Sequence, residues 1–261
     1  MRIFHIHSGG VQELAELPAQ MPAQGFVWIA CARPVFQAQL TEIQASLQAL
    51  VGLQLVDLHV SDLLNAQLPS HYDYTSQYDL LVFRRLATAQ GDTVDSPVEG
   101  DSPASPLKRS GPPVLRRIDT SPVGFAVFDQ LLLTVHPADC AVRDAYAARL
   151  LASLPTSNGT EGRSSPVPGA RVPASPADLM LRVVNMMVDR YLDLRRELTR
   201  QLDHWQAELL HPKARFSNWG SLLDARISLH QLDEICEDQR SAVQDWIEAL
   251  ATWEPTEHNG G

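Results

Sequence analysis

Residues 177–210 read ADLMLRVVNMMVDRYLDLRRELTRQLDHWQAELL, a stretch that contains neither proline nor glycine. Its apolar side chains recur in steps of three and four, which is typical of a helix with an apolar stripe close to heptad spacing. A helix of this length spans roughly 50 Å. It therefore has to lie against the rest of the chain, against another helix or against copies of itself, and we expect a homo-oligomer. The stripe consists of Met187, Tyr191, Leu194, Leu198, Leu202, Trp205 and Leu209.

A second long helix is predicted directly after the first. His211-Pro212 ends the first helix, because proline cannot continue it. Ser217 or Asn218 can cap a new helix that runs to about Trp253. Two long helices joined by a short link predict an antiparallel hairpin. The apolar positions of the second helix are Leu222, Leu229, Leu232, Cys236, Val243, Ile247 and Leu250.

The residues before the hairpin mix strand and helix patterns, which predicts an α/β fold with a mixed β-sheet flanked by helices. Apolar and β-branched runs indicate strands at 3–7, 26–31, 53–58, 78–84, 123–128 and 131–135, the last two as a hairpin. Helices are expected from Pro34 to about Val51, over a short stretch from Ser61 to Asn65, and from Asp139 to about Ser153.

Composition divides the chain into three parts. Residues 1–153 form the α/β domain, interrupted near 89–113 by a segment rich in Gly, Ser, Pro, Asp and Thr that we expect to be disordered. Residues 154–176 have a similar composition and are interpreted as a linker. Residues 177–261 form the helical hairpin, which is called the stalk below.

The charge and cysteine content exclude several classes of protein. A formal charge of -10 argues against nucleic-acid binding, since that function needs a basic face. An acidic surface suits divalent cations, although it also serves solubility alone. The three cysteines are widely spaced, which argues against a disulfide framework or a zinc finger. We find no signal peptide and no apolar run of the roughly 18 residues that a spanning helix needs.

Motifs of the common catalytic sites are missing from the sequence. It has no Gly-x-Ser-x-Gly, no His-Glu-x-x-His and no phosphate-binding glycine loop. We therefore expect no enzymatic activity and no organic cofactor. An enzyme with an unrecognised site is the least favoured alternative.

Four segments, taken in order, resemble the CorA family of divalent-metal transporters. Residues 58–65, LHVSDLLN, are similar to a short helix of that family, and the region from Pro69 to the strand LLVFR at 80–84 resembles the family's next segment, which enters a central strand. LLLTVH at 131–136 is similar to a strand ending in a Thr-Val-His-like tripeptide, and VDRYL at 188–192 resembles a Val-Asp-Asp-Tyr stretch of the first long helix. The likeness extends from about residue 50 to 250.

The resemblance implies a homopentameric transporter of Mg²⁺, or of Zn²⁺ in the ZntB branch, anchored in the bacterial inner membrane. This chain corresponds to its N-terminal cytoplasmic, regulatory domain, which meets the membrane only through a later segment. The family's Gly-Met-Asn signature comes after the stalk, and Asn185-Met186 does not match it because Val184 precedes it. The alternative is a free-standing soluble oligomeric scaffold with the same fold and no transport activity.

Asp62 is the site residue that the resemblance singles out. An acidic residue at this place in the family helps to form a regulatory metal site between neighbouring subunits, with its partner further along the stalk. A hard cation such as Mg²⁺ takes oxygen ligands and keeps most of its water, so one or two carboxylates suffice. Asp62 could instead simply cap or solvate a short helix.

A second candidate lies on the stalk, where Asp233 and Glu237 share one helical face and Glu234 and Asp238 share another. A metal is one way to compensate such like charges, and ordinary solvated surface is the alternative.

Histidines give weaker candidates. His5 and His7 would share one face of a strand as a zinc pair without a third ligand nearby. His204 and His211 lie two turns apart on one helix, and His136 at a strand end is expected to be structural.

Overall fold

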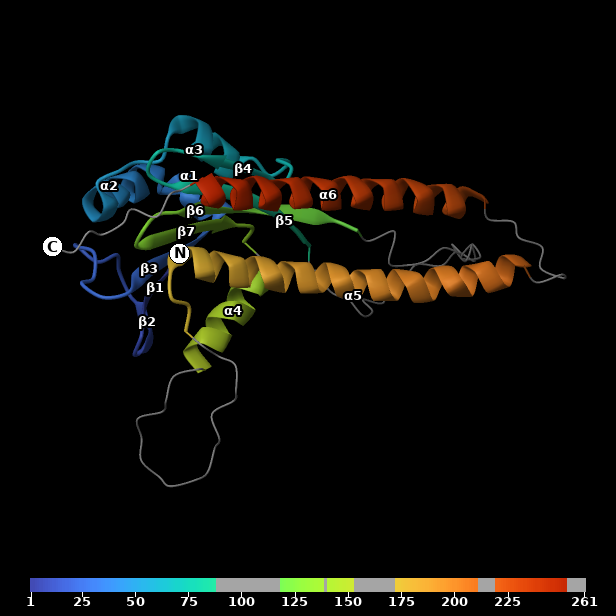
Figure 1. The fold of residues 1–261 in the computed structure, drawn as a ribbon, viewed down its shortest axis with the longest axis horizontal. Helices are drawn as coiled ribbons and strands as arrows, with labels where there is room; N and C mark the ends of the chain where they lie inside the picture. The colour runs from blue at the N-terminus through green and yellow to red at the C-terminus, as the bar shows by residue number, and fades with distance from the viewer. Residues whose placement is uncertain (88–117, 139, 153–171, 211–218, 253–261) are drawn as a thin grey trace, which may run out of the picture.

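A single seven-stranded sheet forms the centre of the computed structural model (Figure 1), in the order β2-β1-β3-β7-β6-β5-β4. The described residues are 1–87, 118–138, 140–152, 172–210 and 219–252. Only β3 and β7 pair in parallel, and the other neighbours pair antiparallel, so the predicted mixed sheet is confirmed. The strands are β1 (Arg2–His7), β2 (Gly10–Leu14), β3 (Phe26–Ala32), β4 (His71–Tyr74), β5 (Asp79–Leu86), β6 (Thr120–Val127) and β7 (Leu131–His136).

One face of the sheet is covered by three short helices, α1 (Arg33–Ala38), α2 (Leu40–Val51) and α3 (Asp57–Leu64). Because strand side chains alternate between faces, Val27, Ile29 and Cys31 of β3 all point to this layer. They pack with Phe36, Ile43 and Leu47 from the helices in one buried cluster. This cluster fixes where α3 lies.

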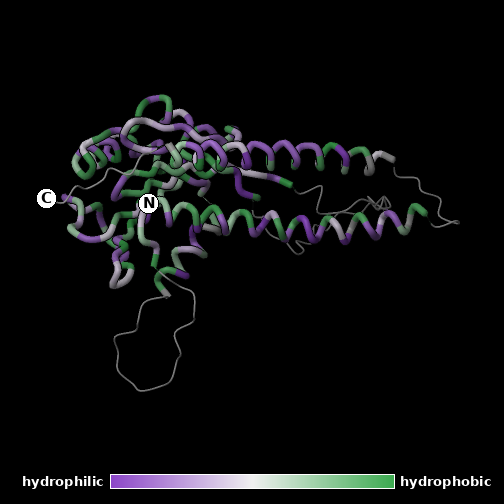
Figure 2. The backbone as a smooth tube through the Cα atoms, in the orientation of Figure 1, coloured by the Kyte–Doolittle hydropathy of each residue, from purple (hydrophilic) through white to green (hydrophobic). Residues whose placement is uncertain are grey.

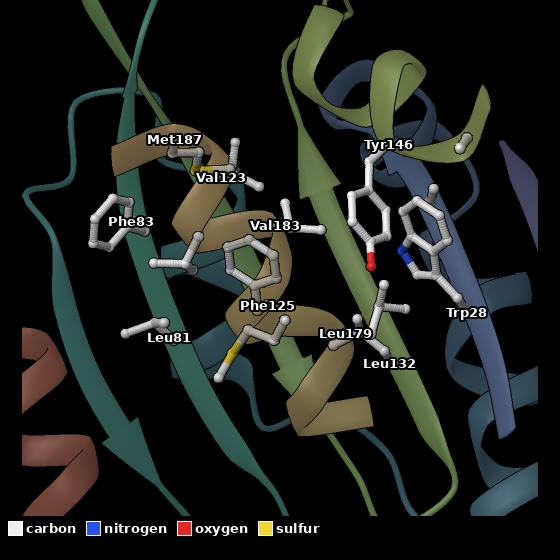
Figure 3. Packing of buried hydrophobic residues seen from close by; sticks show 14 of the residues in the cluster. Trp28, Leu81, Phe83, Val123, Phe125, Leu132, Tyr146, Leu179, Val183 and Met187 are labelled. Carbon is white, nitrogen blue, oxygen red and sulfur yellow. The ribbon is translucent and has the colours of Figure 1, made fainter. Parts of the chain in front are cut away.

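The opposite face is covered by α4 (Ala141–Ala152) and the first half of α5 (Pro176–Leu210). Trp28 stacks on Phe4, with ring centroids 4.8 Å apart, and its indole N–H donates to Thr134 Oγ1 at 3.0 Å. Figure 3 shows α5 crossing the sheet at this core, with Leu179, Val183, Met187, Phe83, Phe125 and Leu132 facing one another.

The two long helices run antiparallel and extend past the sheet (Figure 1), as the predicted hairpin requires. The second of them, α6 (Trp219–Thr252), packs along β4 and β5, and its Ala242 and Trp246 join the same core as α5. Beyond the sheet, Leu198 and Trp205 of α5 cluster with Ala225 of α6. Apolar and polar residues alternate along both helices there (Figure 2). Within the described parts of the chain, no helix is both long and apolar enough to cross a membrane.

The predicted stripes of the two helices are only partly correct. Met187, Tyr191, Leu198 and Trp205 are buried, but Leu202 and Leu209 are exposed on α5. On α6 the exposed Ile247 and Leu250 were expected inside, and Ala242 and Trp246 are buried instead. The helices are supported by the sheet over their inner halves and by each other further out, so no single seven-residue repeat describes one buried face.

The strand predicted at 53–58 is wrong, and α3 begins at Asp57. The backbone of this stretch is satisfied by side chains instead of by a neighbouring strand. Gln44 bonds both the N–H and the carbonyl of Leu55, at 2.8 and 2.9 Å, and the Tyr78 hydroxyl accepts from the Val56 N–H at 3.0 Å. Ser61 consequently lies inside α3 and does not cap it.

Other boundaries also differ from expectation. The helix predicted from Pro34 to Val51 is two helices that meet at Gln39. Strands β2 and β4 were not predicted. The segment near 89–113, most of the linker at 154–176, and the capping candidates Asp139, Ser217 and Asn218 lie outside the described residues. The division into domains remains a prediction.

Candidate metal-binding site between helix α3 and strand β4

Helix α3 is held against the sheet by a close approach at Gly124 of β6. A Cβ at residue 124 would lie 2.2 Å from Cδ2 of Leu63, so the helix can sit this near only because the residue is glycine. The Arg33 guanidinium donates to the Leu63 carbonyl at 3.1 Å and to the Pro122 carbonyl at 2.7 Å. The last turn of α3 is therefore tied to the sheet, and the positions of its outward side chains are defined.

Two histidine–aspartate pairs connect α3 to the edge strand β4. His59 and Asp62 lie three residues apart and share a face of α3, while His71 and Asp73 lie two apart on β4. His59 Nε2 is 3.1 Å from Asp73 Oδ2, and His71 Nε2 is 3.6 Å from Asp62 Oδ2. Each pair therefore joins the histidine of one element to the aspartate of the other.

The His59 pair is a closed hydrogen-bond network. A carboxylate only accepts, so His59 Nε2 donates to Asp73, and His59 Nδ1 then accepts from the Tyr78 hydroxyl at 2.8 Å. Burial raises the pKa of the Asp73 carboxyl, but the hydrogen bonds from His59 and from the Tyr74 N–H outweigh burial and bring that pKa below its usual range. Both nitrogens of His59 are used, which leaves it no atom for a metal.

The Asp62 pair is more open. The side chain of Asp62 is 17% exposed and that of His71 is 31% exposed. Their separation of 3.6 Å is beyond hydrogen-bond range. His71 Nδ1 lies 3.3 Å from the carbonyl of Pro69. Carboxylate oxygen and imidazole nitrogen are both metal ligands, so these two residues fit a divalent cation. Among the described residues, no three His, Cys, Asp or Glu side chains are grouped closely enough to hold one metal ion.

The sequence matches the family model described as CorA-like Mg2+ transporter protein over residues 23–260. The chain belongs to this CorA-like family. The match covers most of the chain and includes strands β3 to β7, α3 with Asp62, and both long helices. No curated protein matches the chain in sequence.

Solved structures share the fold of this CorA-like chain at low sequence identity. The ZntB cytoplasmic domain from Vibrio parahaemolyticus RIMD 2210633 has a TM-score of 0.58 at 14% identity, covering 97% of this chain and 80% of its own. Full-length CmaX has a TM-score of 0.61, and the complete CorA magnesium transporter from Methanocaldococcus jannaschii has 0.60, each at 14% identity. Each of these two matches covers 98% of this chain, which spans 64% of each of those two proteins. At such identity the likeness shows the fold alone.

Three of the four candidate stalk carboxylates of the CorA-like chain, Asp233, Glu234 and Glu237, are solvent-exposed, and Asp238 is half-buried. Glu237 pairs with Arg240 on the same helix, and the hydrogen bond and charge of that guanidinium lower the pKa of Glu237. Asp233 is exposed one turn before it, and Glu234 lies 3.5 Å from His230. Ion pairs with neighbouring bases thus offset part of the like-charge repulsion. The structure brings Asp233 and Glu237 onto one face but does not bring Asp62 to them.

The structure gives the candidate histidines different surroundings. His5 and His7 do lie side by side, with ring centroids 5.0 Å apart, but His5 Nε2 donates to the Gln24 carbonyl at 2.9 Å and His7 Nδ1 accepts from the Gly9 N–H at 3.1 Å. His204 is exposed on α5, and His211 lies outside the described residues. His136 is buried at 1% exposure, as its structural interpretation requires.

Sequence reasoning missed His71, which lies nearest to Asp62. No motif marked it, because it comes nine residues later on a strand that was not predicted. The available signal was the alternation of His71 and Asp73 immediately before the strand at 78–84, which indicates a short edge strand with both side chains on one face.

Proposed function

We propose that this chain is the cytoplasmic, metal-sensing domain of a CorA-type divalent cation transporter in a bacterial inner membrane. Mg²⁺ is the first candidate for the transported ion and Zn²⁺ the second, and both are candidates for the regulatory ion. No organic cofactor is part of the proposal. The family match over residues 23–260 supports the transporter class, and the position of Asp62 supports the sensing role.

Asp62 is the residue on which the sensing role depends. Its side chain is 17% exposed, and its carboxylate lies 3.6 Å from Nε2 of His71 on β4. A carboxylate in this setting can bind a hydrated Mg²⁺ through one oxygen. A ligand from a neighbouring copy would complete the site, so the metal would offset repulsion between acidic subunits and link ion level to assembly. Asp233 and Glu237 are secondary candidates for the same role further along the stalk.

The surface of α5 supports self-association. Leu181, Val188, Leu192 and Leu202 are exposed although they lie on a well-formed helix. Leu181, Val188 and Leu192 follow steps of seven and four, so they form an apolar stripe distinct from the one buried against the sheet, and Arg195 separates this stripe from Leu202. Apolar stripes of this kind mark sites of association. We propose a homopentamer in which these helices contribute to the contacts between copies.

The test is the association state of the chain as a function of metal. We would measure sedimentation velocity at one protein concentration in EDTA, in MgCl₂ and in ZnCl₂, for the wild type, for Asp62→Asn and for the control Asp57→Asn on the same helix. We expect metal to shift the wild type toward a pentamer, and Asp62→Asn to need roughly tenfold more metal. If association did not change with metal, the scaffold alternative would be favoured. If the wild type and Asp62→Asn responded to metal identically, Asp62 would not be part of the site.

A further inference from the structure

We infer that Asp62 and His71 together form a mixed carboxylate–imidazole site that selects a Zn²⁺-class ion over Mg²⁺. This inference rests on the proposed role of Asp62 and names the class of ion that the site takes. His71 is the new element: it comes from β4, whereas Asp62 comes from α3, and their ligand atoms are 3.6 Å apart.

The hydrogen bond on the far side of the His71 ring determines what faces Asp62. The Pro69 carbonyl can only accept, so His71 Nδ1 is the donor in the 3.3 Å contact between them. In the neutral ring the Nε2 lone pair then points toward the Asp62 carboxylate. Two acceptors facing each other repel unless a proton on Nε2 or a metal cation lies between them. Metal-bound histidines commonly use this arrangement, with the other ring N–H donated to a main-chain carbonyl.

The spacing of the two ligand atoms suits a tetrahedral ion. Two bonds of about 2.0–2.2 Å that meet at a tetrahedral or slightly wider angle place their ligand atoms roughly 3.3–3.7 Å apart. Octahedral Mg²⁺, with bonds of about 2.0–2.1 Å at right angles, needs neighbouring ligands only about 2.9 Å apart. The separation of 3.6 Å between Asp62 Oδ2 and His71 Nε2 matches the first case.

Ligand chemistry leads to the same choice. Mg²⁺ takes oxygen ligands and gives up its water reluctantly. Imidazole suits Zn²⁺ and its neighbours in the first transition series. His59 and Asp73, the adjacent pair, bond each other at 3.1 Å and are not available to the metal. The site therefore has two protein ligands from this chain, and water or a residue of a neighbouring copy fills the rest.

The inference is tested by direct metal binding to the full chain. Calorimetric titrations with ZnCl₂ and with MgCl₂ would compare the wild type, Asp62→Asn, His71→Gln and the control His5→Gln, which alters the other histidine pair. Binding of Co²⁺, followed by its visible absorption, reports on tetrahedral geometry, and ¹⁵N NMR of the imidazoles identifies the histidine that is bound. Circular dichroism at each step shows whether the variants are folded, and we expect them to be, because both side chains are partly exposed.

We expect His71→Gln to weaken Zn²⁺ binding at least roughly tenfold and to leave Mg²⁺ binding unchanged, while His5→Gln changes neither. Zn²⁺ should shift the Nε2 resonance of His71. If Asp62→Asn weakens both metals and His71→Gln weakens neither, the role of Asp62 stands and the zinc site is wrong. Equal loss of both metals in His71→Gln also overturns the selectivity. If neither variant changes any binding, the site and the proposed sensing role fail together. Loss of Zn²⁺ in His5→Gln alone moves the zinc site to β1.

Discussion

The hydroxyl of Tyr191 on α5 donates a 2.9 Å hydrogen bond to the main-chain carbonyl of Arg84 on β5. The side-chain amide of Gln239 on α6 donates to the same oxygen at 2.7 Å. The guanidinium of Arg84 donates to the Leu68 carbonyl at 2.8 Å, and the main-chain N–H of Arg84 donates to Ser70 Oγ at 3.0 Å. One residue of β5 thus joins both long helices to the connection that leads from α3 and Asp62 into β4.

This shared carbonyl predicts a non-additive pair of substitutions. Tyr191→Phe or Gln239→Leu alone leaves one donor on the Arg84 oxygen, so each should cost about 1 kcal/mol of unfolding free energy. The double variant leaves a partly buried carbonyl without either donor and should lose about 1 kcal/mol more than the sum. Urea denaturation of the wild type, the two single variants and the double variant measures this additional loss of unfolding free energy. Strict additivity would show that the two hydrogen bonds act independently.

Gly124 predicts a steric effect on α3. Gly124→Ala places a methyl group 2.2 Å from the present position of Leu63 Cδ2, so Leu63 has to move, and we expect a loss of about 1–3 kcal/mol. Gly220→Ala is the control: no atom lies within 4 Å of the added group on α6, and alanine there should stabilise by up to about 1 kcal/mol. Thermal unfolding compares them. An unchanged stability for Gly124→Ala would mean that Leu63 repacks without cost.

Removal of the polar side chain of Gln44 is predicted to cost a large part of the unfolding free energy. It bonds both polar groups of the buried Leu55 backbone, so Gln44→Ala leaves a donor and an acceptor unsatisfied and should cost about 2–4 kcal/mol. Gln48→Ala, one turn later, removes an exposed bond to the Gly52 carbonyl and should cost less than about 0.5 kcal/mol. Chemical denaturation separates the two. Equal losses would contradict the role assigned to Gln44.

His136 predicts a pH dependence of folding. Burial, aided by the nearby Arg143 charge, lowers its pKa from 6.5 to about 4. Nε2 accepts from Arg143 at 3.4 Å, which favours the neutral ring, while the bond from Nδ1 to the Pro137 carbonyl at 2.8 Å raises the pKa and offsets only part of the effect of burial. As the pH falls, the unfolded state binds a proton on His136 before the folded state does. The stability that the neutral ring contributes is therefore fully present above pH 6.5 and is lost as the pH falls to about 4. The full difference is about 3 kcal/mol.

The check on His136 is urea unfolding of the wild type and His136→Gln at several pH values from 7 to 4. The variant should be less stable at pH 7 and should show a shallower fall with pH, because it lacks this titrating group. Parallel curves would assign the pH dependence to other residues. The ring proton shifts of His136 in NMR give its pKa directly.

The helical hairpin was predictable because its signal is local. Residues 177–210 have no helix breaker and show a repeat of three and four, and α5 runs from Pro176 to Leu210. The β6–β7 hairpin was predictable for the same reason, since two apolar runs are separated by only a few residues. Asp62 was identified through a family resemblance, and its surroundings were not.

The remainder depends on contacts between distant residues. Residues 53–58 have the composition of a strand. Their main-chain N–H groups at Leu55 and Val56 bond to the side chains of Gln44 and Tyr78 instead of to a neighbouring strand, so no strand forms there. His71 became a partner of Asp62 only because β4 pairs with β5 and α3 rests on Gly124 of β6.

By itself, the sequence determined that two long helices follow an α/β part of the chain, because periodicity is a property of neighbouring residues. Only the tertiary structure decided which face of each long helix is buried, which carbonyl both helices share, and which histidine faces Asp62. Those outcomes depend on the packing of α3, α5 and α6 against a sheet whose strands come from widely separated parts of the chain.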